Sequence, residues 1–218
     1  MKKNGFTLAE VLITLAIIGV VATLTLPSLM SNTQEQQSIT AFKKAMNTLN
    51  EVAQMNAVVD GFDYSGVTAT GKPSTAAIYD ANGVLGQSIW AMMKSKAQID
   101  EPASIKAGIA LGGCKGQSQI FFRDGTVLCY TPKPTSTGST TYFKAVIDTN
   151  GLKGPNKLSE CGDANCATKS TKKIFDQYYI TLYGSNAVPG WITIDATTGN
   201  VTDGTTNYDN AARFAMRK

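Results

Sequence analysis

The sequence predicts an α+β fold, in which one long N-terminal helix precedes an antiparallel β-sheet head and packs on it. Three observations support this prediction. Residues 11–26 carry no charge, residues 31–59 repeat apolar side chains at helical spacing, and segments after Ala107 alternate as strands do. A chain that places its long helix first and its strands afterwards has the order of elements typical of the α+β class.

The composition is that of a folded chain with many turns. Of the 218 residues, 43% are hydrophobic and 17% are charged, which excludes an intrinsically disordered chain. The 20 glycines, together with the Thr, Ser and Asn of the second half, indicate short strands joined by turns. The formal net charge is +4 and no basic run exceeds two residues, so no nucleic-acid partner is indicated.

The chain contains no histidine, which argues against most common types of enzyme. Ser-His and Cys-His catalysis, the commonest zinc ligand and the usual near-neutral proton shuttle are all removed. Four carboxylates remain as candidates for paired acid–base groups, but no spacing places any two of them together: Glu160, Asp163, Asp195 and Asp203. We therefore expect no enzyme and no catalytic residue.

The four cysteines fall into two local pairs, Cys114 with Cys129 and Cys161 with Cys166. An even count in an exported chain favours disulfides, and four cysteines allow three connectivities. We expect the two local bridges. The alternative, a metal site, needs a tighter C-x-x-C spacing than either pair offers.

The N-terminal segment is long and apolar enough to cross a membrane. Residues 6–30 would form a helix of roughly 37 Å, against a hydrocarbon core of about 30 Å. Lys2 and Lys3 would stay in the cytoplasm, which places the rest of the chain outside it. The apolar stretch runs into residues 25–30 without a small-residue cleavage site, so an ordinary secretory signal is not indicated.

Glu10 is the one charged residue within this segment. A carboxylate in an apolar helix is costly to bury and is a functional candidate by default. The alternative is that Glu10 lies in the headgroup layer, where water hydrates it.

The string Gly5-Phe6-Thr7-Leu8-Ala9-Glu10 closely resembles the processing site of type IV pilins and type II secretion pseudopilins. The resemblance implies that a prepilin peptidase cuts between Gly5 and Phe6 and methylates the new N-terminus of Phe6. Glu10 matches the acidic position of that family. Gly19 and Pro27 stand at matching distances to its helix glycine and helix proline.

The resemblance also implies partners and a location. The partners would be copies of the chain and related pilins, the prepilin peptidase and an inner-membrane assembly platform. The chain would cross the cytoplasmic membrane once, with its head outside the cytoplasm, before joining a periplasmic or cell-surface filament. The implied divisions are a leader (1–5), a transmembrane half-helix (6–30), an amphipathic half-helix (31–60) and a head (61–218).

A physical argument gives Glu10 a role in subunit assembly. Cleavage frees the amine of Phe6, which stays basic after methylation and can pair with Glu10 of a neighbouring copy. In an apolar bundle, this attraction offsets desolvation only when the helices are in register. Glu10 is thus a hypothetical register residue.

Pro27 predicts a kink near Thr23, since proline cannot donate to the helix ladder and clashes with the preceding turn. The alternative is that Pro27 ends the membrane segment. We expect a continuous helix, because a stripe of apolar residues resumes afterwards on one face: Ile39, Phe42, Met46, Leu49 and Ala53. This stripe predicts a surface packed on the sheet, and Asp60-Gly61 predicts the helix end.

The head is expected to hold one short helix and several strands. Residues 88–96 predict the helix, whereas residues 61–83 predict mostly loop. Residues 119–130 predict a hairpin with a two-residue turn at Asp124-Gly125. Further strands are expected at 142–148, 178–183 and 191–195, a loop at 131–140, and turns at 195–210.

The segment 148–156 resembles a strand-end loop of pilin-like proteins. Its Asp and Asn side chains can fix a turn through nearby backbone amides, while Gly151 tolerates positive φ. Some pseudopilins bind calcium in a head loop, and Asp148, Asn150 and Asp163 could supply oxygen ligands. We favour the structural turn, because the EF-hand spacing is absent, and keep calcium as the alternative cofactor.

The leading functional hypothesis is a structural filament subunit. Loss of residues 1–5 removes Lys2 and Lys3 and leaves a charge balance of only +2, which gives little support to DNA capture. The alternative is a membrane-tethered binding module or adhesin, whose ligand surface would be the loops at 61–80, 131–140 and 195–210.

Overall fold

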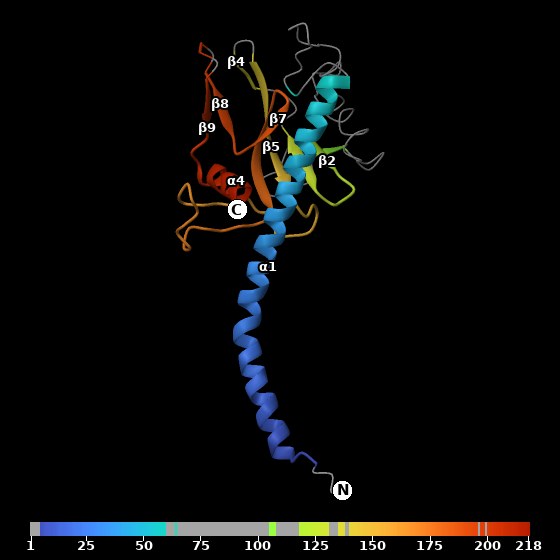
Figure 1. Ribbon diagram of the computed structural model, residues 1–218, viewed down its shortest axis with the longest axis vertical. Helices are drawn as coiled ribbons and strands as arrows, with labels where there is room; N and C mark the ends of the chain where they lie inside the picture. Colours follow the sequence, from blue (N-terminus) through green and yellow to red (C-terminus); the bar gives the residue numbers. More distant parts are fainter. Residues whose placement is uncertain are drawn as a thin grey trace. The chain divides into compact units, whose positions relative to one another are not determined.

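The computed structural model describes residues 5–59, 64, 105–107, 118–130, 135–137, 140–195, 197–198 and 200–218. Its chain forms two compact units, residues 1–37 and residues 38–218, each of which is described by itself. The helix α1 (Leu8–Val59) runs through both (Figure 1).

The first unit is the N-terminal part of α1. Its large apolar side chains are exposed, from Phe6 (88% exposed) to Met30 (60% exposed). The helix continues without a break through Pro27, as the prediction of a helix running past the proline requires. The predicted kink near Thr23 stays a prediction.

The second unit begins with the remainder of α1. The predicted apolar stripe is confirmed as a packing surface, because all five of its residues are at most 3% exposed. They lie in one core with the inner face of the sheet. The helix ends at Val59, directly before the predicted stop, which lies outside the described residues.

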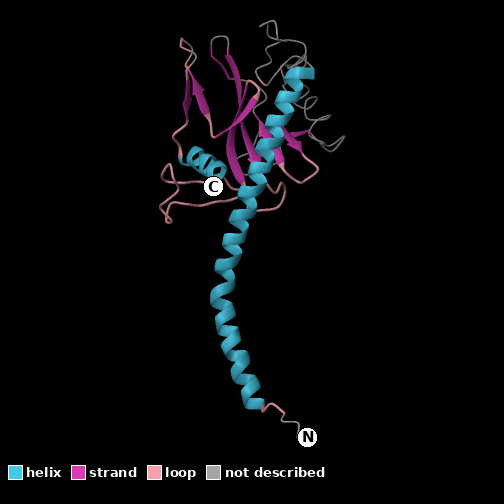
Figure 2. Cartoon of the chain, viewed as in Figure 1, coloured by secondary structure: helices cyan, strands magenta, loops and turns pink. Residues whose placement is uncertain are grey.

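The sheet of the head is antiparallel in every described pairing, and residues 38–59 of α1 lie across one face of it (Figure 2). Its strand order is β1-β2-β3-β5-β6-β7, with β4 also paired to β5. The strands are β1 (Ile105–Ala107), β2 (Ser118–Phe121), β3 (Val127–Tyr130), β4 (Thr135–Thr137), β5 (Thr140–Asp148), β6 (Gln177–Tyr183) and β7 (Asn186–Pro189). The predicted α+β class, with a long helix followed by antiparallel strands, is confirmed.

One row of cross-strand neighbours explains how the sheet meets α1. Ile120 is opposite Leu128, Leu128 is opposite Ile147, and Ile147 is opposite Tyr178. Residues opposite one another on neighbouring strands share a face. The ring of Tyr178 stacks on Phe42 of α1 at 4.3 Å between centroids, which joins this row to the helix.

The hairpin of β2 and β3 corrects the predicted two-residue turn. Phe122 and Thr126 are hydrogen-bonded across three loop residues, and Gly125 has a φ of +90°. A three-residue loop with its last residue at positive φ is a common hairpin connection. A two-residue turn would shift the register by one and place Ile120 opposite Cys129, on the wrong face of the sheet.

The C-terminal region differs most from the prediction. Strands β8 (Ile192–Ile194) and β9 (Val201–Asp203) pair as a second small sheet, and α4 (Asn207–Arg217) follows. We predicted only turns at 195–210, and this is wrong for β9 and α4. Thr206 and Asp209 form a capping box, the signal that marks the start of this helix.

Two smaller corrections concern loops. The expected loop at 131–140 contains β4, whose Thr135 and Thr137 lie opposite Tyr142 and Thr140 of β5. Threonine and tyrosine both favour strands. Strand β7 was not predicted, since it is a four-residue edge strand ending in proline. The predicted helix at 88–96 and loop at 61–83 lie outside the described residues, except for Tyr64.

Candidate functional site

The expected cleavage site lies just before the first turn of α1. Gly5 and Phe6 are exposed and precede the helix, which begins at Leu8. A Cβ added to Gly5 would meet no atom within 4 Å. The packing of the described residues therefore does not itself require glycine at this position, and cleavage after Gly5 stays a prediction.

Thr7 and Glu10 form reciprocal hydrogen bonds at the start of the helix. The backbone N–H and the hydroxyl of Thr7 donate to Glu10 Oε2 at 2.8 and 2.7 Å, and the N–H of Glu10 donates to Thr7 Oγ1 at 3.3 Å. This is a capping box, which satisfies N–H groups that a helix start leaves unpaired. Our sequence reasoning missed it, although T-x-x-E before an apolar run is its signal.

The exposed apolar surface of this unit needs a partner other than water. The helix holds an 18-residue window of mean hydropathy 2.3, none of it buried within the chain. By length and composition it is able to cross a membrane. A contiguous apolar surface of this kind indicates lipid or other apolar helices as its environment.

A comparison with protein families identifies this N-terminus. Residues 1–26 match the prokaryotic N-terminal methylation motif. The chain carries the type IV pilin and pseudopilin signal. This match includes residues 5–10, on which the resemblance to pilins rests. It supports a processed subunit of the pilin or pseudopilin type, which is a structural class of protein. No curated protein and no solved structure matches the chain with significance.

In the head, a disulfide between Cys161 and Cys166 is present, as predicted, with a Cα–Cα distance of 5.1 Å. The two cysteines are buried in one cluster with Ala211 of α4. Cys129 is also disulfide-bonded, whereas Cys114, its predicted partner, lies outside the described residues.

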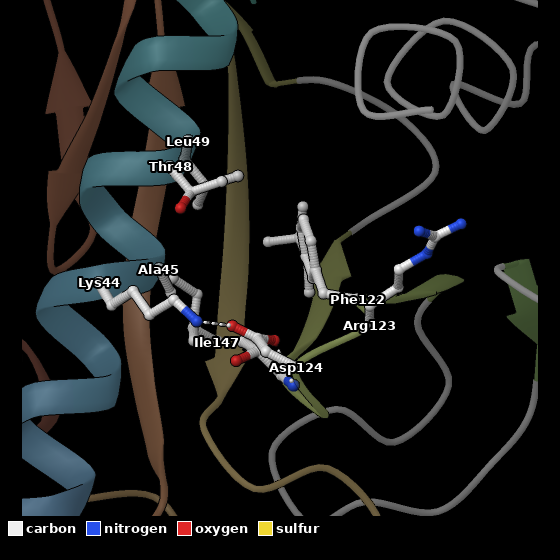
Figure 3. A pocket seen from close by; sticks show the side chains of 10 residues that line it. Lys44, Ala45, Thr48, Leu49, Phe122, Arg123, Asp124 and Ile147 are labelled. Carbon is white, nitrogen blue, oxygen red and sulfur yellow. Dashed lines mark hydrogen bonds and ion pairs between the residues drawn. The ribbon is translucent and has the colours of Figure 1, made fainter. Parts of the chain in front are cut away.

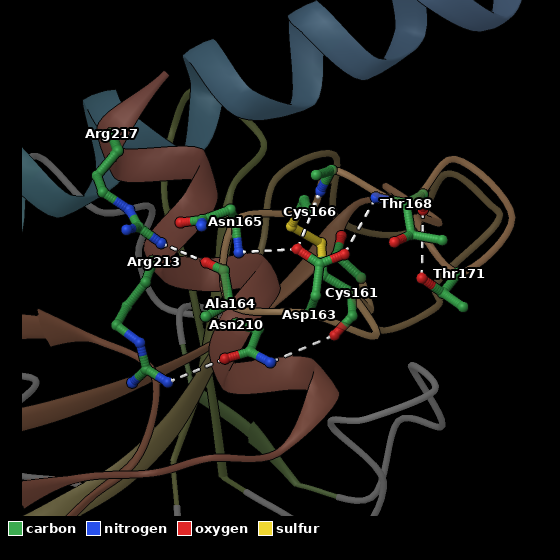
Figure 4. Close-up of a disulfide and its surroundings, with 12 residues drawn as sticks. Cys161, Asp163, Ala164, Asn165, Cys166, Thr168, Thr171, Asn210, Arg213 and Arg217 are labelled. Carbon is green, nitrogen blue, oxygen red and sulfur yellow. Dashed lines mark hydrogen bonds between the residues drawn. A yellow bond between two sulfur atoms is a disulfide. The ribbon is translucent and has the colours of Figure 1, made fainter.

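Asp163 organises the loop that this disulfide closes. Its carboxylate accepts the N–H groups of Asn165, Ala167 and Thr168, each at 3.0 Å (Figure 4). The hydrogen bonds from Ala167 and Thr168 lower the pKa of Asp163 to about 2. A carboxylate that accepts several backbone N–H groups is held in its charged form.

Asp148 and Asn150 lie in the turn that follows β5. The buried carboxylate of Asp148 accepts the N–H groups of Asn150 at 3.1 Å and Gly151 at 2.7 Å, and Nε2 of Gln177 at 2.7 Å. Burial raises the pKa of Asp148 to about 6. Gly151 has a φ of +66°, and a Cβ there would clash with the carbonyl of Gly125.

Asn156 fills the same turn. The amide of Asn156 finds partners for both its atoms when its oxygen and nitrogen are exchanged. In that orientation Nδ2 donates to the carbonyls of Gly151 and Lys153, at 2.8 and 3.1 Å, and to Asp148 Oδ2 at 3.1 Å. Protein donors thus account for the fixed shape of this turn. In the described residues, no group of three or more His, Cys, Asp or Glu is placed to hold a metal ion. Calcium binding at Asp148 and Asn150 stays a prediction.

The carboxylates considered for acid–base chemistry mostly have local structural partners. Glu160 pairs with Lys173 at 2.7 Å. Asp195 accepts the N–H groups of Thr197 and Thr198 at 2.9 and 2.7 Å, which lowers its pKa. Asp203 is exposed at the end of β9.

The head also contains a cavity of about 210 Å³ between α1 and the turn joining β2 to β3. Lys44 of α1 pairs with Asp124 of the turn at 2.8 Å beside it (Figure 3). Apolar side chains form much of its wall: Ala45, Leu49, Phe122, Leu128 and Ile147. Asp124 also accepts the N–H of Thr126, so the ion pair ties the three-residue loop to the helix.

Proposed function

We propose that the chain is a structural subunit of a type IV pilus or a type II secretion pseudopilus. Processing after Gly5 and methylation of Phe6 precede assembly through the N-terminal helix. The proposal is supported by the match of residues 1–26 to the methylation motif. These residues stand at the start of a helix whose apolar side chains are exposed.

The two units of the chain suit two tasks. Residues 6–30 anchor the precursor in the cytoplasmic membrane, because their exposed apolar side chains match the environment of lipid tails. After release from the membrane, the same surface packs against the helices of other copies and related pilins. The head, with its own core, stays outside the cytoplasm and is displayed by the filament.

The proposed partners are therefore of three kinds. A prepilin peptidase recognises residues 1–10, an inner-membrane platform extracts the subunit, and further subunits surround it in the filament. Glu10 pairs with the amine of Phe6 in a neighbouring copy. One positive and one negative charge buried together offset much of their desolvation, whereas a slipped register leaves each unpaired.

The first experiment determines the N-terminus of the protein purified from its native membrane by intact mass. We expect a chain that begins at Phe6 and carries one methyl group. A chain that still begins at Met1, in cells with an active peptidase, would contradict the proposal and favour a plain membrane-tethered binding module.

The second experiment examines filaments. Shearing of cells and sedimentation separate a surface filament from the membrane fraction. Recovery of the processed chain in sheared filaments supports a pilus. Recovery only when the secretion system is overproduced supports a pseudopilus, whose filament normally stays in the periplasm.

A further inference from the structure

The positive charge of the chain is concentrated in two segments of the head. Residues 157–173 and 214–218 contain six basic and two acidic residues, whereas the rest of the chain contains 14 of each sign. These two segments therefore account for the whole formal net charge of +4.

Contacts between the two segments bring the basic side chains together. Nζ of Lys172 and Nζ of Lys218 lie over the ring of Phe214, at 5.0 and 5.7 Å from its centroid. Arg217 donates to the carbonyl of Ala164, in the loop that the disulfide closes. A neutral ring and a carbonyl hold cations in place without cancelling their charge. We call the six basic side chains the basic surface: Lys157, Lys169, Lys172, Lys173, Arg217 and Lys218.

The basic surface lies at the end of the head where α1 enters it. Ser38, the first residue of the second unit, donates to the carbonyl of Phe175 and lies 3.0 Å from the hydroxyl of Tyr178. Lys173 precedes Phe175 by two residues, and Nζ of Lys157 lies 5.7 Å from the centroid of the Phe175 ring. Figure 1 shows the orange segments of the chain at this end of the sheet.

This end of the head stays close to any membrane that α1 crosses. Ser38 follows Met30 by eight residues, a helical rise of about 12 Å, of which the headgroup layer takes up about 5–7 Å. The remaining distance is shorter than the Debye length of about 8 Å at physiological ionic strength. Because the chain already holds the head there, at a high effective concentration, a weak attraction is sufficient for contact.

We propose that the basic surface binds the headgroups of anionic phospholipids. It holds the head of the anchored subunit against the outer leaflet of the membrane until the subunit is assembled. The inference rests on the proposed function only for the membrane anchor. Nucleic acid is the alternative partner of a basic surface, but the membrane is always within reach of this one.

The experiment uses the full chain in lipid nanodiscs. One set contains phosphatidylcholine alone, and the other contains three parts phosphatidylcholine to one part phosphatidylglycerol. An uncharged acetylating ester is added in small amounts, and mass spectrometry gives the rate of acetylation at each lysine. Lys157 and Lys173 report on the basic surface, and Lys144 of β5 is the reference within the same molecule.

We expect Lys157 and Lys173 to react at least about threefold more slowly in the anionic nanodiscs, because an anionic surface attracts cations and favours their protonated form. Lys144 should react at the same rate in both. About 0.5 M salt should abolish the difference, since it screens the attraction.

Two triple variants test whether charge is the cause. The first removes three charges from the basic surface and keeps both reporters, and the second removes three charges elsewhere on the head. We expect the first to lose most of the protection of the reporters and the second to keep it. The variants are K169Q/K172Q/K218Q and, as the matched control, K43Q/R123Q/K144Q.

Equal rates of the two reporters in both lipids, or protection that the first variant leaves intact, would overturn the inference. Protection by a DNA oligonucleotide in neutral nanodiscs, with none from phosphatidylglycerol, would assign the surface to nucleic acid instead. Failure of the proposed function is seen elsewhere, in an uncleaved N-terminus of the native protein. It does not affect this measurement on the membrane-inserted chain.

Discussion

The side chain of Asn50 accepts the backbone N–H of Ala187 at 2.6 Å, which ties α1 to the edge strand β7. Without this bond, the N–H of Ala187 at a sheet edge facing the helix would lose its acceptor, and the cost of an unpaired donor exceeds the net value of a normal hydrogen bond.

Replacement of Asn50 by alanine should therefore lower the free energy of unfolding by about 1–2 kcal/mol. The measurement uses a soluble fragment, residues 31–218, which contains the amphipathic half-helix and the head and is called the soluble head below. Urea unfolding monitored by circular dichroism measures it. The control is Asn47→Ala, an exposed residue one turn earlier on the same helix, which should have no such cost. Equal stability of the two variants would show that water replaces the Asn50 acceptor.

The main architecture could be predicted because its signals are local. The stripe from Ile39 to Ala53 is read from spacing alone, and the same residues are buried on the sheet. The N-terminal signal is likewise a continuous string of residues. The apolar stripe and the N-terminal signal can each be recognised from residues that are close together in the sequence.

What the sequence did not predict depends on distant contacts. Helix α4 is only 11 residues long, too short to be stable alone, and is held by β6, β7 and the disulfide loop. The hairpin loop that ends at Gly125 is one residue longer than predicted. Its length follows from the register, which places Ile120 and Leu128 together on the face that packs on α1. The capping box of Thr7 and Glu10 is an exception, because it is local and its T-x-x-E motif could have predicted it.

The buried carboxylate of Asp148 gives the head a defined dependence on pH. Burial raises the pKa of Asp148 from its usual range to about 6 in the folded state. Between about pH 4 and 6, Asp148 is still protonated in the folded head but already ionised in the unfolded chain. The free energy of unfolding therefore falls as pH rises through this window. Above it, the folded state carries the cost of the buried charge.

Replacement of Asp148 by asparagine should remove this dependence. We expect the loss of stability between pH 4 and 7 to be smaller in Asp148→Asn than in the wild type by on the order of 1–3 kcal/mol. Urea midpoints of the soluble head at four pH values measure the slope. Asp203→Asn, at an exposed strand end, removes a carboxylate that is not buried and is the matched control. A slope unchanged in Asp148→Asn would refute the assignment.

Calcium can be tested on the same turn. The donors from Asn150, Gly151, Gln177 and Asn156 already satisfy Asp148, so we expect the melting temperature of the head to be the same in excess calcium and in excess chelator. A rise in melting temperature with calcium that disappears in Asp148→Asn would instead establish the alternative, a calcium site at Asp148 and Asn150.

The disulfide between Cys161 and Cys166 should affect α4 as well as overall stability. Three hydrogen bonds join the disulfide loop to α4: Cys161 N–H to Asn207 O, Asn210 Nδ2 to Cys161 O, and Arg217 Nη2 to Ala164 O. The two cysteines also share a buried cluster with Ala211 of α4. The loop and the helix therefore support each other in the folded state.

Replacement of both cysteines by alanine should lower the free energy of unfolding by about 2 kcal/mol, as the chain-entropy model gives for so short a loop. It should also raise the rate of amide hydrogen exchange in α4 relative to β5, because α4 loses its fixed neighbour. The exchange comparison separates two mechanisms. If α4 exchanges as in the wild type while overall stability falls, the disulfide acts only on the unfolded chain. If α4 alone exchanges faster, the bridge holds the C-terminal helix in place.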